Sequence, residues 1–419
     1  MSRSTSIPSM QARPSLLAGP WRLKLFYLCY LMGNGVFVPY LALYYHAIHL
    51  LGAQIGLLAS LSPVASVVLQ PLWGVLSDRY RLRRQLLTAC LLCGAVLAPV
   101  VVLAPSFGLL LPLILALAIA TSPISPLADA TTLEWLRQHG GSYGSVRVYG
   151  SFGFLLTSLV VGSLYSGTRI FWLFSLYGTF LFLAFLVSFT VPRQEDTVQI
   201  TGTNEGVGTL LRNRAMLVFL LLVFVGYSTY AAYNTFLALY LKGLGANTTA
   251  VGLAWGLGTL SELPVMALAG RAIARLGVKT LLLIGFGAAC VRWIAYGLLH
   301  DYRLAVLVSA LHGLSFAAYY VAGVTYVDTH VPARLRATGQ TMFNAATFGL
   351  GTFVGANLFG TLYDRIQAHA MFLVAGAICL LAVIGIAVLV PGDAPRHTEQ
   401  AFTAPATSPG GGVEGPARS

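Results

Sequence analysis

Five side chains that can carry charge or a proton stand inside otherwise apolar stretches: Asp129, Arg147, Glu262, Arg292 and His312. An ionised side chain at the centre of a bilayer costs at least about 2.5–3.5 kcal/mol, so such groups mark solute sites, proton carriers or ion pairs. Two acids and two arginines predict one pair in each half of the chain. A carboxylate whose partner changes between conformations could carry a proton, and so could a histidine. The alternative is that these charges form structural ion pairs that only hold helices together.

The composition places these residues in a membrane protein. Of the 419 residues, 57% are hydrophobic and 9% are charged, whereas an average soluble domain has roughly 25% charged residues. A helix needs roughly 20 apolar residues to cross the hydrocarbon core. The sequence therefore predicts an all-α membrane protein with twelve transmembrane helices, at residues 25–48, 54–76, 85–104, 108–133, 145–166, 170–191, 214–241, 249–270, 278–299, 304–329, 338–362 and 370–391.

Lysine and arginine set the orientation of these helices. With both termini on the cytoplasmic side, nineteen Lys and Arg residues lie on the cytoplasmic face and four on the opposite face, which is the distribution that the positive-inside rule describes. The net charge of +12 then reflects basic residues that orient the helices in the membrane, and it predicts no binding to nucleic acid. Residues 1–22 are polar and predict a cytoplasmic leader rather than a cleaved signal peptide.

The longest internal connection divides the twelve predicted helices into six and six. At an offset of 196 residues, Gly74 matches Gly270 and Arg83 matches Lys279, which predicts a duplicated six-helix unit. The predicted organisation is a leader at 1–22, an N-terminal half at 23–192, a cytoplasmic linker at 193–213, a C-terminal half at 214–391 and a disordered cytoplasmic tail at 392–419.

The segment after the second predicted helix contains Gly74, Asp78, Arg79 and Arg83 and resembles the signature loop of the major facilitator superfamily. That resemblance implies the major facilitator fold, with two six-helix pseudo-repeats. Gly74 would let two helices approach closely, and the Asp78 carboxylate would lie near the positive N-terminus of the helix that begins near Thr338. We interpret the four residues as a conformational latch; the alternative is a loop that only enforces topology.

A finer resemblance lies in the fourth and fifth predicted helices. Asp129 and Arg147, 18 residues apart and followed by Phe154, are similar to the pattern of lactose permease and its relatives, the nucleoside and phenylpropionate proton symporters. In lactose permease a carboxylate and an arginine at this separation bind the sugar. The resemblance therefore implies that Asp129 and Arg147 bind the solute and that Phe154 is a stacking platform.

The C-terminal half matches this branch in part. Glu262, Arg292 and His312 fall where lactose permease has functional residues of those types. However, Ser315 stands where the permease has its proton-carrying carboxylate, and Ser309 stands where it has a lysine. Proton coupling by that particular route does not carry over, and the chain resembles the phenylpropionate and nucleoside branches more readily than the sugar permeases.

Further residues predict a lining for a small solute. Tyr227, Tyr230 and Tyr233 share one face of a helix beside Asn234, and Asn34 adds a polar group from the first helix. Aromatic packing within the bundle is the alternative for each tyrosine. The predicted solute-binding residues are Asn34, Asp129, Arg147, Phe154, Tyr230, Asn234, Arg292 and His312, and the predicted proton-coupling residues are Asp129, Glu262 and His312.

These residues predict a secondary active transporter of the bacterial cytoplasmic membrane. It would move a nucleoside, a sugar or an aromatic acid by alternating access and proton symport, as a monomer in the lipid bilayer. The alternative within transport is proton-coupled efflux of drugs or metabolites. An enzyme is disfavoured because no clustered nucleophile, base or nucleotide-binding loop is present. No cofactor is expected, and Cys90 and Cys93 predict helix packing rather than a metal site.

Overall fold

The chain is helical in every regular element of the computed structural model. The structure describes residues 20–80, 82–104, 106–165, 167–191, 207–332 and 335–392. In lipid, each backbone N–H and C=O must be satisfied within the chain, and a helix does this locally. Almost all of the predicted tail and leader, and most of the linker, lie outside the described residues.

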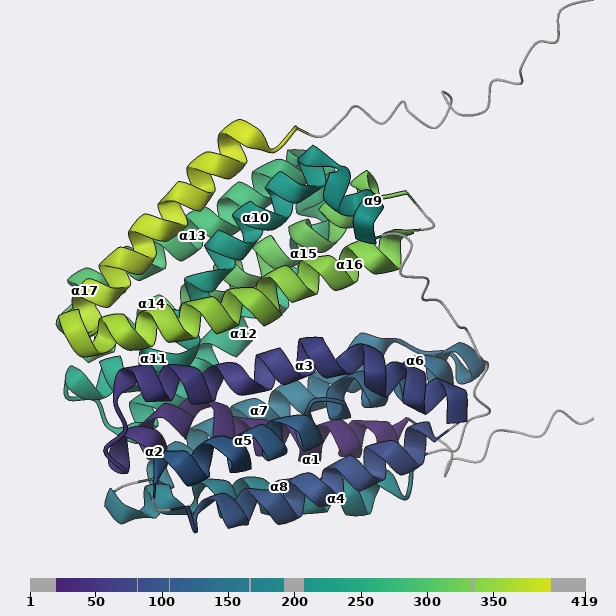
Figure 1. The fold of residues 1–419 in the computed structure, drawn as a ribbon, viewed down its shortest axis with the longest axis vertical. Coiled ribbons are helices and arrows are strands. Elements are labelled where there is room, and N and C mark those ends of the chain that lie inside the picture. Colours follow the sequence, from purple (N-terminus) through teal and green to yellow (C-terminus); the bar gives the residue numbers. More distant parts are fainter. Residues whose placement is uncertain are drawn as a thin grey trace, which may run out of the picture.

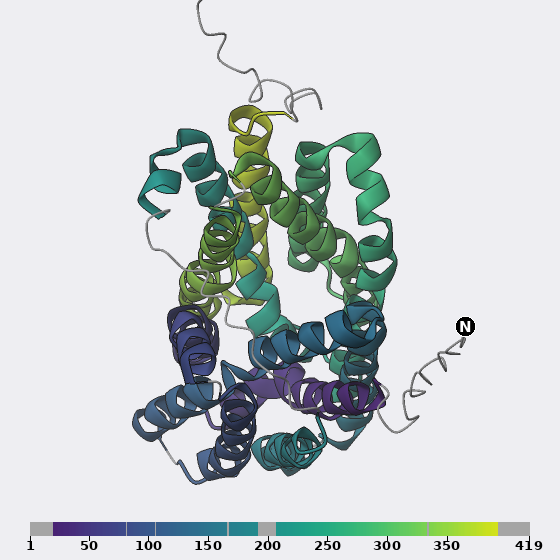
Figure 2. The same ribbon diagram turned by 90° about the vertical axis from the view of Figure 1, so that its right-hand side faces the viewer.

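Two groups of helices correspond to the two predicted halves. The first group contains α1 (Trp21–Phe37), α2 (Leu41–Ala47), α3 (Gly52–Tyr80), α4 (Arg83–Val101), α5 (Phe107–Thr121), α6 (Ile124–His139), α7 (Tyr143–Leu164) and α8 (Leu173–Ser188). The second group contains α9 (Val207–Arg212), α10 (Arg214–Ser228), α11 (Tyr230–Gly243), α12 (Thr248–Leu276), α13 (Val278–Leu298), α14 (Tyr302–Val308), α15 (His312–His330), α16 (Arg336–Asn344) and α17 (Thr352–Leu389). In Figure 1 the first group lies below the second. Figure 2 views the molecule from the end where α9 and α16 lie and shows two bundles.

Eleven helical segments within the described residues are long and apolar enough to cross a membrane. The last of these, Arg336–Leu389, has 54 residues, which at 1.5 Å per residue is roughly 80 Å, more than twice the hydrocarbon thickness. Its backbone leaves the helical region at Gln367, where φ is 59° and ψ is 176°. This segment therefore turns back at Gln367 and contains two spans, which confirms the twelve predicted.

Five predicted spans are divided between two helices each. The span predicted at 25–48 is divided into α1 and α2, that at 108–133 into α5 and α6, that at 214–241 into α10 and α11, that at 304–329 into α14 and α15, and that at 338–362 into α16 and α17. Near the break between α5 and α6 stands Pro123, which has no backbone N–H to donate to the preceding turn. Hydropathy alone could not find these breaks, because the apolar character continues across them.

Basic side chains at corresponding positions hold the last helix of each half. The Arg84 guanidinium donates to the Phe189 carbonyl at the C-terminal end of α8 (2.5 Å), and the Lys279 ammonium donates to the Ala387 carbonyl in the last turn of α17 (2.8 Å). A cation is favourable at a helix C-terminus, where carbonyl groups lack intrahelical partners. The two basic residues are 195 positions apart and the two acceptor residues 198, close to the predicted offset of 196, so the contacts support the duplicated unit.

The two halves contact each other through α3 with α17 and through α7 with α12. The closest contacts lie toward the face opposite the Lys- and Arg-rich one, which we call the outer face. A Cβ atom added at Gly56 would overlap the Ala356 carbonyl, and one at Gly252 would overlap the Ser158 carbonyl. The Tyr40 hydroxyl donates to the same Ser158 carbonyl. The outer ends of the two halves are therefore tightly packed.

The cytoplasmic ends of the same helices are apart. No atom lies within 4 Å of the position that a Cβ would take at Gly74 or Gly270 among the described residues. The predicted close helix approach at Gly74 is therefore wrong for this conformation, because the halves separate before α3 reaches its cytoplasmic end. The Asp78 side chain lies outside what the structure describes, so the latch stays a prediction. Arg79 is exposed beside the Tyr80 ring.

Candidate functional site

A cluster around Asp129 forms the part of the site that belongs to the first half. The Tyr27 hydroxyl on α1 and the Tyr143 hydroxyl on α7 both donate to Asp129 Oδ1, at 2.5 and 2.9 Å. The Arg147 guanidinium lies 3.9 Å from the same oxygen. About a third of each charged side chain is exposed, 34% for Asp129 and 35% for Arg147. The predicted pair is confirmed as a neighbouring pair that solvent can reach.

The Asp129 and Arg147 pair is held loosely, which leaves it free to contact a solute. A separation of 3.9 Å is longer than a hydrogen bond, and the Arg147 charge is shared with the Tyr27 ring, whose centroid is 5.3 Å away. Two tyrosine hydroxyls partly satisfy the carboxylate instead. Asp129 Oδ2 can therefore accept a hydrogen bond from a bound molecule, and the exposed part of the Arg147 guanidinium can donate one to it.

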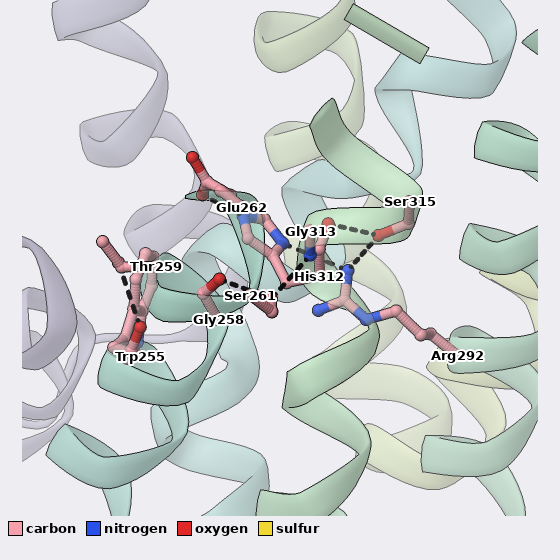
Figure 3. A network of polar contacts seen from close by, with 9 residues as sticks. All are labelled: Trp255, Gly258, Thr259, Ser261, Glu262, Arg292, His312, Gly313 and Ser315. Atoms are coloured by element: carbon pink, nitrogen blue, oxygen red, sulfur yellow. Dashed lines mark hydrogen bonds and ion pairs between the residues drawn. The ribbon is translucent and has the colours of Figure 1, made fainter. Parts of the chain in front are cut away.

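The second half contains a linear chain of polar contacts, shown in Figure 3. His312 Nε2 lies 3.1 Å from Glu262 Oε1. On its other side, His312 Nδ1 lies 3.2 Å from Arg292 NH1, which also donates to Ser315 Oγ at 2.7 Å. The chain runs from Glu262, which is 22% exposed, to Arg292, which is fully buried. The predicted acid and arginine are thus joined through a histidine rather than paired directly.

The hydrogen-bond partners assign the tautomer of His312. A guanidinium can only donate, so Nδ1 must accept from Arg292 and carries no hydrogen. The ring hydrogen is then on Nε2, which donates to the Glu262 carboxylate. His312 is therefore neutral in this arrangement and connects a buried cation to a titratable acid.

A close approach of two helices brings Glu262 and His312 together. Ser261 Oγ donates to the Gly258 carbonyl within α12 and accepts from the Gly313 N–H of α15, at 2.6 and 2.8 Å. A Cβ at Gly313 would overlap the Ser261 backbone. Glycine at 313 therefore lets α15 lie directly against α12, and it brings Glu262, which follows Ser261, into contact with His312, which precedes Gly313.

Arg292 and Tyr230 are buried where no solute reaches them in this conformation, so their solute-binding roles stay predictions. Both are 0% exposed. The Arg292 guanidinium carbon lies 4.4 Å from the Tyr233 ring centroid and 4.9 Å from that of Trp293, and such rings stabilise a desolvated cation. Tyr230 stacks on Tyr227 at 5.2 Å. Aromatic packing, the alternative for these tyrosines, is the observed arrangement.

The other predicted residues are partly exposed. Phe154 on α7 faces Trp255 on α12 across the two halves, with ring centroids 6.4 Å apart. Asn34 is half-buried and its amide donates to the Tyr30 carbonyl of its own helix (3.2 Å). Asn234 is also half-buried. These three positions stay predictions as solute contacts, since the structure holds no solute.

Sequence reasoning missed both tyrosines that bind Asp129. Tyr143 precedes Arg147 by four residues and so shares its helix face, which is a signal that could have identified it. Tyr27 lies 102 residues before Asp129 and has no local pattern that connects it to the site. Trp255 was also missed as a partner of Phe154, because the two residues lie in different halves of the chain.

We expect Tyr143→Phe to weaken solute binding. The change removes one of the two hydroxyl donors to Asp129 Oδ1, so the carboxylate loses part of its orientation. The apparent KM for uptake should rise roughly fivefold, which corresponds to about 1 kcal/mol. Tyr149→Phe on the same helix is the matched control, because Tyr149 is 43% exposed. Equal KM values for the two variants would contradict the role of the Tyr143 hydroxyl.

The chain is similar to known membrane transporters over most of its length. The sequence model of the MFS_1 like family matches residues 20–374. The chain is 30% identical over 367 residues to a maltose permease of Geobacillus stearothermophilus, over 87% of this chain and 92% of that protein. It is 27% identical to a probable 3-phenylpropionic acid transporter of Escherichia coli (strain K12), over 86% and 95%. The solved structure of the nucleoside transporter NupG has a TM-score of 0.80 at 18% identity and covers 89% of this chain and 99% of its own.

Proposed function

Because the chain belongs to the MFS_1 like family, a group of multi-pass membrane transporters, we propose that it moves a small organic solute by alternating access and proton symport. It is a transporter and not an enzyme. The solute class we propose is a nucleoside, a sugar or an aromatic acid, which are the kinds of molecule named for its relatives and structural neighbour. The transporting unit we propose is the monomer.

The contact between Glu262 and His312 is the observation that carries the proton-coupling part of the proposal. Glu262 is a titratable group that is 22% exposed on one side and bonded to a neutral histidine on the other. A proton on Glu262 removes the negative charge that faces His312 Nε2–H. The contact between α12 and α15 is therefore stronger when Glu262 is ionised than when it is protonated. In this way, protonation of Glu262 is coupled to the relative position of the two helices.

The first half supplies the solute contacts in this proposal. Asp129 accepts from and Arg147 donates to polar groups of the solute, while Phe154 and Trp255 contact its apolar part. Because Asp129 and Glu262 lie in different halves, rocking of one half against the other changes the distance between solute site and proton site. The order in which the proton and the solute bind then determines which conformations of the two halves the transporter reaches.

Efflux by proton antiport is the second candidate, and the direction of proton movement separates the two. In symport, solute added outside inverted or right-side-out vesicles moves inward together with protons, so the external medium becomes alkaline. In antiport, the same addition drives protons out of the vesicle, so the medium becomes acidic. The resemblance of the segment around Arg147 and Phe154 to symporters favours the first outcome.

The experiment is a proton-flux measurement on the full chain in proteoliposomes. External pH is recorded while a sugar, a nucleoside and an aromatic acid are added in turn. We expect alkalinisation with one class, and loss of that signal in Asp129→Asn. Glu134→Gln is the matched control, because Glu134 lies on the same helix and pairs with Arg137 at the cytoplasmic end (3.0 Å).

Four results would overturn parts of the proposal. Acidification would replace symport by antiport while keeping transport. Solute accumulation with no proton signal, or normal transport by Asp129→Asn, would indicate that these charged residues form structural ion pairs instead. A signal lost equally in Glu134→Gln and Asp129→Asn would show that the solute site does not depend on Asp129 in particular.

A further inference from the structure

An acidic residue of one half occupies a helix N-terminus of the other half at the outer face. The Asp364 carboxylate, near the outer end of the first span within α17, accepts from the Gly52 N–H with Oδ1 (2.7 Å) and from the Ala53 N–H with Oδ2 (2.9 Å). Both donors belong to the first turn of α3. One side chain thus makes two hydrogen bonds across the boundary between the halves.

We propose that Asp364 is a gating residue of the transport cycle, which holds the outer face closed by capping α3 from the opposite half. The first N–H groups of a helix have no partner within it and usually bind a side chain just before the helix. Here the Leu51 N–H is satisfied locally by Gln54 Oε1 (3.0 Å), whereas the next two donors are satisfied by Asp364. The cap of α3 is complete only while the halves are together.

The packing around Asp364 makes this contact specific to the closed outer face. A Cβ at Gly52 would lie 2.7 Å from the Gly360 carbonyl and 2.8 Å from Asp364 Oδ1, and one at Gly360 would overlap the Gly52 carbonyl. Helix backbones touch at this point, so the carboxylate cannot keep both bonds when the outer ends move apart. The negative charge also lies at the positive end of α3, which adds a charge–dipole attraction that opening removes.

The position of Asp364 distinguishes gating from ordinary helix capping. Asp301, also at the outer face, caps α14 by accepting from the Arg303 N–H (2.8 Å). Asp301 and its helix belong to the same half and move together, so this cap is indifferent to the conformation of the transporter. The two aspartates therefore form a matched pair, one capping across the halves and one within a half.

The test measures the separation of the halves at the outer face by pulsed electron paramagnetic resonance. Spin labels are attached at Leu103→Cys in the first half and Leu298→Cys in the second, in a chain without its five native cysteines. Both positions are exposed, 78% and 62%. In Asp364→Ala we expect the ratio of long to short distances to rise roughly tenfold, because two charge-assisted bonds are lost from the closed state. Asp301→Ala should keep the distribution of the unsubstituted pair.

Each outcome decides the proposal. An unchanged distance distribution in Asp364→Ala overturns it, and so does an equal shift in Asp301→Ala, which would indicate general loosening. If Asp364→Ala is not recovered folded, Asp364→Asn carries the test: it keeps the side-chain size but loses the charge, and should give a smaller shift in the same direction. No solute or proton gradient is present, so the result does not depend on the proposed solute or coupling ion.

Discussion

Glu262→Gln should abolish uphill solute uptake and leave solute exchange intact. A glutamine can still accept from His312 Nε2–H through its own Oε1, so the 3.1 Å contact and the packing of α12 on α15 are preserved. What disappears is the ability of residue 262 to take up and release a proton. Accumulation driven by a proton gradient should therefore fall at least tenfold, to the level set by the solute gradient alone.

Two measurements on Glu262→Gln check this expectation. Counterflow, in which labelled solute exchanges against unlabelled solute, needs binding and alternating access but no net proton transfer, so it should stay near the unsubstituted rate. Uptake driven by an imposed pH gradient should be lost. Loss of both activities would mean that Glu262 has a structural or solute-binding role, and retention of both would exclude it as the proton carrier. Glu134→Gln changes an acid that pairs with Arg137 outside the site, and this variant should retain both activities.

Gly252→Val should stop transport by preventing closure of the outer face. The added side chain would occupy the space of the Ser158 carbonyl and the Tyr40 hydroxyl, where α7 and α12 touch. Overpacking of this kind typically costs about 1–3 kcal/mol, which is roughly 5- to 150-fold in an equilibrium. The cost falls on the conformation that is closed outside. We expect an uptake rate reduced at least tenfold and an increased fraction of molecules open at the outer face.

Gly270→Val is the matched control, because it makes the same change on the same helix. No atom lies within 4 Å of a Cβ at Gly270 among the described residues, so the new side chain meets open space in this conformation. Uptake and thermal stability of the two variants in detergent are compared. Equal uptake would contradict the role of close packing at Gly252, and a large loss of stability in Gly252→Val alone would indicate misfolding rather than arrested gating.

Local sequence was sufficient to predict the membrane spans and the neighbouring charged residues Asp129 and Arg147 in the first half. Asp129 and Arg147 could be paired because both are charged in apolar helices that follow one another in the chain, and such charges need partners in a bilayer. Glu262 and His312 were both singled out for the same reason. The breaks within the predicted spans, such as the one near Pro123, were missed, since apolar residues are present on both sides of each break.

Burial could not be read from residue type. Arg292 was predicted to bind solute because it is an intramembrane charge, yet it lies in the core among Tyr233, Trp293 and Tyr296. The faces of these rings stabilise a cation without a carboxylate, an arrangement that depends on two helices, α11 and α13, meeting at one level. Only their tertiary packing decides whether the arginine faces the solute or supports His312.

The sequence by itself predicted the twelve spans, their orientation and the duplicated halves, and it identified the residues able to carry charge through a membrane, because the cost of charge and of unpaired backbone in lipid acts on each segment separately. The tertiary structure alone decided that Tyr27 binds Asp129, that Arg292 reaches Glu262 only through His312, and that Asp364 caps α3. Each of these contacts joins segments far apart in the chain, and no local pattern records which helices will pack together.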